Sequence, residues 1–262
     1  MKNSLKKRPE RSIETGDIFQ LGGHKLLCGD ARNPEQIEHF LNKEKLTLIL
    51  TDPPYGVAYV EGKKGFTQMK ADTRRIANDH IQSETEYRCF TLEWLKACKA
   101  NLKPHNAFYI FNSDKMVFGL REGIRDAGFN FTQLLIWAKT HAVIGRMDYL
   151  PQHELIAYGW LGKHAFMKSK DKSILTYPKP NKSPLHPTMK PVGLLRRLIL
   201  NSSKTQDMVY DPFGGSGSTL IACEQTKRKC RMVEIDPRYC ETILRRFEEL
   251  TGIAPVKLTR KT

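Results

Sequence analysis

The segment LTLILTDPPY, residues 46–55, sets the pattern for the rest of the chain. Its first five residues form an apolar run, which predicts a short buried strand. The next residues place a carboxylate, two prolines and an aromatic ring directly after that strand. We therefore expect these polar and aromatic groups to lie where the strand opens into a cleft.

Asp52, Pro53, Pro54 and Tyr55 together suit a planar ring that carries an amine. The carboxylate of Asp52 and the carbonyl of Pro53 can each accept a hydrogen from an exocyclic NH2 group, and Tyr55 offers a stacking face. The prolines stiffen the backbone and remove two amide donors. The alternative is an ordinary turn, because Pro-Pro-Tyr also occurs in turns without function.

Apolar runs and amphipathic segments alternate along most of the chain, which predicts an α/β fold with a doubly wound, mostly parallel sheet. Ser83 and Glu86 form a capping box at the start of one helix. Strands are expected at 25–28, 46–50, 106–111, 131–137, 154–158, 208–210 and 230–235. Helices are expected at 34–42, 83–102, 115–127, 190–201, 216–225 and 237–250.

The balance of charge indicates a polyanionic partner. The 262 residues include 43 Lys plus Arg against 28 Asp plus Glu, a net charge of +15, and the pI is near 9.6. Basic residues gather in two segments without periodicity, 60–82 and 140–185. The alternative is that the positive charge only keeps the protein soluble. The nucleic-acid contacts expected from these segments are Lys63, Lys64, Arg74, Arg75, Arg146, Lys168, Lys170 and Lys172.

Cysteine and histidine spacing gives no sign of a metal site or a cysteine nucleophile. The six cysteines form no C-x-x-C pair, none follows a proline, and the eight histidines lack metal-ligand spacing. We expect no metal and reduced thiols. No apolar run is long enough to span a membrane and no signal peptide is recognisable, so the protein is expected to stay inside the cell.

A second motif, residues 211–219, reads DPFGGSGST and lies between a strand and a helix. Its glycines let the backbone approach a ligand closely at the carboxyl end of the strand. Glu234 ends the next strand, at the spacing of an acid that binds ribose hydroxyls. The loop has no Lys of a phosphate-binding type, so a nucleoside cofactor without a triphosphate is favoured.

Together these motifs resemble the S-adenosylmethionine-dependent amino-group DNA methyltransferases of the beta arrangement, in which Asp-Pro-Pro-Tyr precedes Phe-x-Gly-x-Gly. The resemblance covers about residues 17–250 and includes Leu135-Ile136-Trp137 and the His-Pro-x-x-Lys-Pro element at 186–191. It implies a Rossmann-like methyltransferase fold and S-adenosylmethionine as cofactor. The implied catalytic residues are Asp52, Pro53, Pro54 and Tyr55. The implied cofactor-binding residues are Asp30, Asp52, His186, Thr188, Lys190, Asp211, Phe213, Gly215, Ser216, Gly217 and Glu234.

The resemblance also implies how the chain is divided and what it does. The expected parts are a basic arm (1–16), a catalytic half (17–139), a target-recognition insertion (140–185), a cofactor-binding half (186–252) and a tail (253–262). The implied activity is sequence-specific methylation of adenine N6 in double-stranded DNA on a flipped-out base, because an Asp at the first motif position is typical of that branch.

Other functions stay open on the sequence alone. They are cytosine-N4 methylation, methylation of RNA or of a protein amide, and non-catalytic binding of DNA. A homodimer and a separate restriction endonuclease are also left open as partners.

Overall fold

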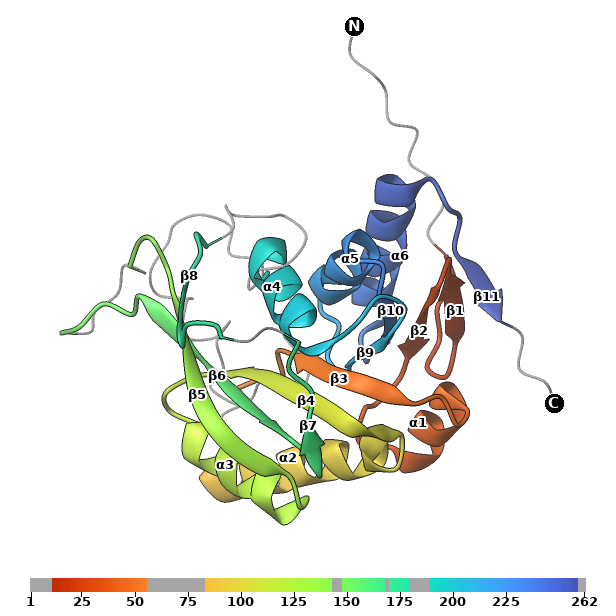
Figure 1. The fold of residues 1–262 in the computed structure, drawn as a ribbon. Helices are drawn as coiled ribbons and strands as arrows, with labels where there is room; N and C mark the ends of the chain where they lie inside the picture. The colour runs from red at the N-terminus through yellow and green to blue at the C-terminus, as the bar shows by residue number, and fades with distance from the viewer. Residues whose placement is uncertain (1–10, 56–82, 143–147, 168–169, 180–188, 259–262) are drawn as a thin grey trace, which may run out of the picture.

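The computed structural model describes residues 11–55, 83–142, 148–167, 170–179 and 189–258, and its strands form one mixed sheet (Figure 1). The sheet order is β11-β1-β2-β10-β9-β3-β4-β6-β5-β8, and β7 pairs with β4 off this path. The strands are β1 (Ile18–Leu21), β2 (His24–Cys28), β3 (Leu46–Thr51), β4 (Leu102–Asn112), β5 (Asn130–Ala138), β6 (His153–Trp160), β7 (Lys163–His164), β8 (Ile174–Thr176), β9 (Met208–Asp211), β10 (Lys229–Glu234) and β11 (Val256–Leu258).

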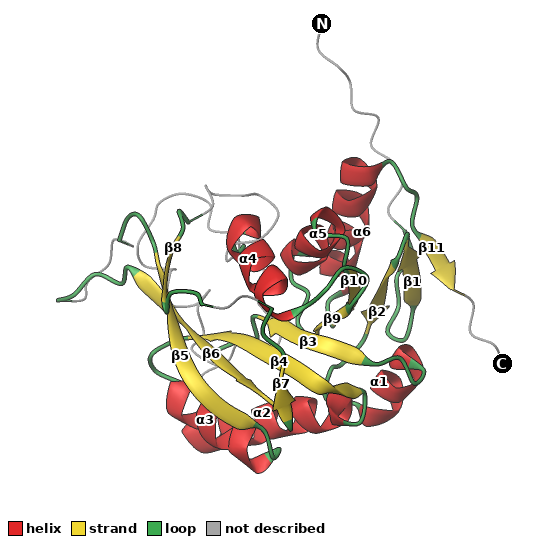
Figure 2. Ribbon diagram, viewed as in Figure 1, coloured by secondary structure: helices red, strands yellow, loops and turns green. Residues whose placement is uncertain are grey.

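The helices cover both faces of this sheet, as Figure 2 shows, with α1, α2 and α3 on one face and α4, α5 and α6 on the other. They are α1 (Pro34–Leu41), α2 (Glu84–Lys99), α3 (Val117–Asp126), α4 (Val192–Ser202), α5 (Ser218–Gln225) and α6 (Pro237–Thr251). Each face has its own apolar core. One core centres on Phe247, Leu198 and Trp137, and the other on Trp94, Phe40 and Ile110.

Five neighbouring strands, β2, β10, β9, β3 and β4, run parallel. Strand β6 runs antiparallel between β4 and β5, so β5 points the same way as β4. The α/β fold with a doubly wound, mostly parallel sheet is thereby confirmed. Among the residues that the structure describes, no helix is both long and apolar enough to cross a membrane.

Local sequence explains where the helices begin and end. Asn33 caps α1 by accepting from the backbone N–H of Gln36, and proline occupies the first turn. Ser83 and Glu86 form the expected reciprocal capping box of α2. Gly252 ends α6 in the left-handed conformation, with φ at 73°.

Several segments differ from their expected description. The range 140–185 contains β6, which lies inside the central sheet rather than beside it. The expected tail contains β11, which pairs with β1, and neither β11 nor β1 was among the predicted strands. The guanidinium of Arg11, in the expected arm, binds Glu248 on α6 at 2.7 Å. Leu102 begins β4 instead of ending the preceding helix.

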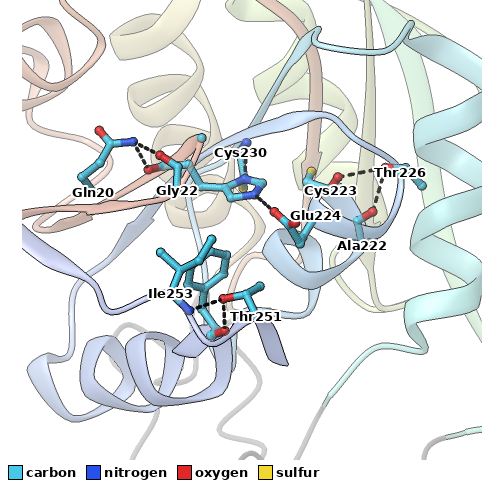
Figure 3. Close-up of polar contacts among 12 residues, drawn as sticks. Gln20, Gly22, Ala222, Cys223, Glu224, Thr226, Cys230, Thr251 and Ile253 are labelled. Carbon is cyan, nitrogen blue, oxygen red and sulfur yellow. Dashed lines mark hydrogen bonds and ion pairs between the residues drawn. The ribbon is translucent and has the colours of Figure 1, made fainter. Parts of the chain in front are cut away.

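A buried histidine joins the start of β2 to the end of α5. The backbone N–H of Cys230 donates to Nδ1 of His24 at 2.9 Å, so the proton of the neutral ring lies on Nε2 and is donated to Glu224, 2.8 Å away (Figure 3). Burial lowers the pKa of His24. Thr226 closes the same helix end by donating to the carbonyls of Ala222 and Cys223.

The adjacent strands β3 and β9 form a topological switch point. The helix after β3, α2, packs on one face, whereas the helix after β9, α5, packs on the opposite face. In open α/β sheets, ligands bind outside the carboxyl ends of strands at such a point. Both sequence motifs follow these two strands.

Candidate active site

The carboxyl ends of β3 and β9 are linked by a buried hydrogen bond. The hydroxyl of Thr51 donates to Oδ1 of Asp211 at 2.7 Å. The backbone N–H of Phe213 donates to the same oxygen at 3.2 Å. The link holds the start of the Asp-Pro-Pro-Tyr turn against the start of the glycine loop. Two motifs about 160 residues apart in the sequence therefore share one end of the sheet.

Asp52 lies in a compact network of charged and hydroxyl groups. Its Oδ1 accepts a hydrogen bond from the Tyr55 hydroxyl at 2.6 Å, and its Oδ2 pairs with the ammonium of Lys190. Lys190 also contacts Oε2 of Glu154 at 3.2 Å. The Tyr55 hydroxyl lies 3.3 Å from the same Glu154 oxygen. The two carboxylates thus face one ammonium and one phenol.

A second lysine completes the network. Nζ of Lys139 binds Oε1 of Glu154 at 2.9 Å. Both ammonium groups are nearly inaccessible to water, since Lys139 and Lys190 are each 6% exposed. Aromatic rings line them: Lys190 lies 5.2 Å from the centre of the Phe111 ring and Lys139 lies 5.3 Å from that of Trp137. Such contacts stabilise a desolvated cation.

The direction of β6 explains why Glu154 reaches this site. Because β6 runs antiparallel to β4 and β5, its beginning lies at the edge where those strands end. Glu154, its second residue, pairs with Trp137, and the backbone N–H of Lys139 donates to the carbonyl of Gln152. Asn112, at the end of β4, pairs with Leu155.

Burial and charge act in opposite directions on this network. Burial raises the pKa of Asp52, the charge of Lys190 lowers it, and the nearby charge of Glu154 raises it again. Burial also acts to raise the pKa of Glu154, but Lys190 and Lys139 outweigh it and the pKa falls below its usual value. The two environments therefore shift the pKa values of Asp52 and Glu154 in opposite directions. This pattern is typical of sites where two carboxyl groups have different tasks.

The glycine loop folds around the carboxylate of Glu234. The backbone N–H of Gly215 donates to Oε2 at 2.7 Å, and that of Asp236 donates to Oε1 at 2.9 Å. Gly217 has φ at 80°, and a Cβ there would lie 3.1 Å from a side-chain carbon of Ile243. A residue with a side chain would be strained there, so the turn requires glycine.

Two acids of this region titrate near neutrality. Burial raises the pKa of Asp211 to about 7 and that of Glu234 to about 7. Behind the loop, Nη1 of Arg246 on α6 donates to the carbonyl of Ser216 at 2.9 Å and to Oγ of Ser218 at 3.2 Å. Burial lowers the pKa of Arg246.

Two further residues that were expected to bind the cofactor, Asp30 and Phe213, lie around the same edge of the sheet. The backbone N–H of Gly29 donates to the carbonyl of Glu234 at 2.9 Å, which brings Asp30 beside that acid. Both carboxylate oxygens of Asp30 bind Arg32. The ring of Phe213 packs against Phe90 and Trp94 at 5.5 and 5.6 Å between centres.

Most of the other expected residues lie outside the described part of the chain. His186 and Thr188 fall outside the described residues, as do Lys63, Lys64, Arg74, Arg75, Arg146 and Lys168. Lys170 and Lys172 are described and exposed. Lys190, which was expected to bind the cofactor, contacts Asp52 and Glu154. The described part holds no group of three or more side chains that could ligate a metal ion.

Glu154, Lys139 and Arg246 were not predicted as functional residues. The signal for the first two was a charged residue at one boundary of an apolar strand: Lys139 directly follows β5, and Glu154 is the second residue of β6. The sequence does not tell which strands are neighbours in the sheet, so this signal could not show that the two residues meet. Arg246 carried no signal beyond its place on an amphipathic helix.

Comparison with known proteins identifies the family. The family model described as DNA methylase matches residues 46–245. The chain belongs to this family. Membership makes it a DNA methyltransferase whose methyl donor is S-adenosylmethionine. The matched range begins with β3 and ends within α6, so it contains both motifs of the switch point.

Individual relatives of this DNA methylase agree with the assignment. The type II methyltransferase M.HpaI of Haemophilus parainfluenzae is 27% identical over 252 residues, which cover 86% of this chain and 74% of the relative. A crystal structure of an M1.HpyAVI–SAM complex superposes with a TM-score of 0.62 at 23% identity, covering 84% and 98% of the two chains. The cytosine-N4-specific PvuII DNA methyltransferase gives 0.65 at 17%, covering 87% and 91%.

The residues present fit the methyl donor. Glu234 offers a buried carboxylate to ribose hydroxyls, and a side chain at Gly217 would strain the cradle beside it. Asp30 lies next to Glu234 through the Gly29 hydrogen bond. Glu234 and Asp30 lie at the same edge of the sheet as Asp52, where the parallel strands end.

Proposed function

We propose that this DNA methylase transfers a methyl group to adenine N6 at a specific sequence in double-stranded DNA. The observation that carries the proposal is the link between Thr51 and Asp211 at 2.7 Å, which holds the amine-binding turn against the cofactor loop. The activity is proposed for the cytoplasm of a prokaryotic or phage-infected cell.

The proposed chemistry needs no protein nucleophile. Bound S-adenosylmethionine supplies an electrophilic methyl group on a sulfonium centre. The target amine becomes a nucleophile when its lone pair is withdrawn from conjugation with the ring. Asp52 and the carbonyl of Pro53 accept the two amine hydrogens and so favour a tetrahedral nitrogen.

Asp52 keeps acceptor capacity for this task. A carboxylate has about four lone-pair sites, and two of those of Asp52 are used by Tyr55 and Lys190. The hydroxyl of Tyr55 fixes its ring beside the carboxylate, where we propose that it stacks on the flipped base. Pro54 fixes the turn. The proton that the amine loses after transfer passes to Asp52.

The choice of adenine rests on the resemblance at Asp52, since the cytosine-N4 branch more often carries Ser there. The choice of DNA rests on the family and on the basic charge of the chain. The exposed Lys170 and Lys172 are proposed to contact phosphate. Neutralising both by Lys→Gln should reduce the slope of log affinity against log salt by roughly 1.8, since each phosphate contact contributes about 0.9. An unchanged slope would remove these two lysines from the DNA contact surface.

The decisive experiment is modification-sensitive sequencing of DNA from cells that express the protein or its Asp52→Ala variant. N6-methyladenine at a recurring sequence is expected with the parent and absent with the variant. A matched control is Glu122→Ala, which removes an exposed carboxylate on α3 and should leave methylation unchanged.

Two results would contradict the proposal. Detection of N4-methylcytosine instead of N6-methyladenine would mean that the target base is cytosine, while the proposed chemistry of transfer to an amine would stand. Methylation by Asp52→Ala at the parent rate would refute the role of Asp52. Calorimetric binding of S-adenosylmethionine should be similar for the parent and the variant, which shows that the variant is folded.

A further inference from the structure

The network around Asp52 contains a second carboxylate that the proposed chemistry does not use. Glu154 comes from β6, a strand about 100 residues further along the chain than Asp52. Its side chain is 20% exposed, and both carboxylate oxygens face lysines: Oε1 binds Lys139 at 2.9 Å and Oε2 faces Lys190 at 3.2 Å. A charge that is largely removed from water is costly unless it is well paired.

The network holds four charged groups whose charges sum to zero. Two carboxylates, Asp52 and Glu154, face two ammonium groups, Lys139 and Lys190. Lys190 is the group that both carboxylates share. Glu154 therefore takes part of the positive charge that would otherwise act on Asp52 alone.

We propose that Glu154 is a positioning residue for methyl transfer: by sharing Lys190 with Asp52, it places the ammonium and leaves the Asp52 carboxylate a strong acceptor for the amine hydrogens. The inference rests on the proposed function, since it assigns a task to a group next to the proposed amine clamp. Without Glu154, Lys190 would pair with Asp52 alone, and its full charge would compete with the substrate amine for the lone pairs of that carboxylate.

The electrostatic surroundings of Asp52 agree with this assignment. Tyr55 faces it from its own loop and Lys190 from the segment before α4. Glu154 acts from β6, and Asp211 lies at the end of neighbouring β9. Of these groups, Lys190 lowers the pKa of Asp52 and Glu154 raises it.

Two further groups act on this network from a distance. Tyr87, on α2, interacts electrostatically with Tyr55. The hydroxyl of Tyr87 accepts from the side-chain amide of Asn112 at 2.7 Å. Lys139 is linked to Asp52 through Glu154. Because the charge of Glu154 raises the pKa of Asp52, removing that charge should lower this pKa.

The test compares Glu154→Gln, Glu154→Asp and the control Glu122→Gln by single-turnover transfer from tritiated S-adenosylmethionine to PCR-amplified bacterial DNA. Glu154→Gln should lower the transfer rate about 100-fold, the effect of a small misplacement of a reacting group. The acidic limb of its pH–rate profile should move to lower pH. Glu154→Asp keeps the charge and should restore part of the rate, and the control should match the parent.

A second measurement separates positioning from a general loss of structure. The ¹³C signal of the Asp52 carboxyl, assigned by its absence in Asp52→Asn, should titrate at lower pH in Glu154→Gln than in the parent. Cofactor affinity should stay within about twofold of the parent. A parental rate with an unmoved acidic limb would overturn the inference, as would a rate that falls equally at every pH while the Asp52 titration is unmoved. Absence of transfer to DNA by the parent would instead refute the proposed function.

Discussion

The affinity for S-adenosylmethionine should depend on pH through Glu234. We propose that the carboxylate form of Glu234 accepts hydrogen bonds from the ribose hydroxyls, whereas the protonated form would lose an acceptor. Burial raises the pKa of Glu234 to about 7. The ionised fraction is then about one tenth at pH 6 and about nine tenths at pH 8, so the dissociation constant should fall about tenfold between these values.

Isothermal titration calorimetry between pH 6 and pH 8 measures this effect. The matched variant is Glu234→Gln, which keeps the size of the side chain and removes its titration. Its affinity should be weaker at pH 8, because an amide cannot accept from both Gly215 and Asp236, which each donate to one oxygen in the parent. The difference between the two pH profiles isolates Glu234 from titration of the cofactor itself. Parallel profiles for parent and variant would refute the reasoning.

Three further outcomes are expected. Burial raises the pKa of Asp211 to about 7 from an ordinary 3.8, so folding favours its protonated form. The free energy of unfolding should therefore fall by about 1 kcal/mol per pH unit as the pH rises from 5 to 7. Asp211→Asn should flatten that slope in urea titrations, and an unchanged slope would contradict the assignment. Arg246→Met removes the hydrogen bond to the Ser216 carbonyl. Calorimetry should then show a cofactor affinity about tenfold weaker, without loss of fold. A parental affinity would show that this hydrogen bond does not support cofactor binding. Asp171→Ala breaks the hydrogen bond with Arg197 at 2.9 Å, and limited proteolysis should then cut the 140–185 range faster than in the parent, which equal rates would disprove.

Local motifs were the part of the fold that the sequence revealed well. The capping box at Ser83 and the proline that starts α1 mark helix starts within a few residues. The apolar run before Asp52 predicted β3, and the glycine loop predicted the transition from β9 to α5. Each of these signals lies within a span of about ten residues, so no information about distant pairing was needed.

Pairing between distant segments was the part that local signals did not reveal. Strand β6 was expected at nearly its observed residues, but its place between β4 and β5 depends on hydrogen bonds with strands far along the chain. The same pairing brings Glu154 to Lys190. Strand β11 is exposed throughout, and its alternation of Val, Lys and Leu spans only three residues, which is too short to identify a strand from sequence.

The two ends of the described chain lie on the same side of the molecule. Arg11 binds Glu241 and Glu248 on α6, and Leu258 pairs with Ile18 on β1 (Figure 1). A linker between these ends, with a new opening at residues 180–182 and so before the His-Pro-x-x-Lys-Pro element, would give a circular permutant in which the glycine loop precedes Asp-Pro-Pro-Tyr. Because the switch point depends on the order of strands in space and not along the chain, such a permutant should build the same pocket.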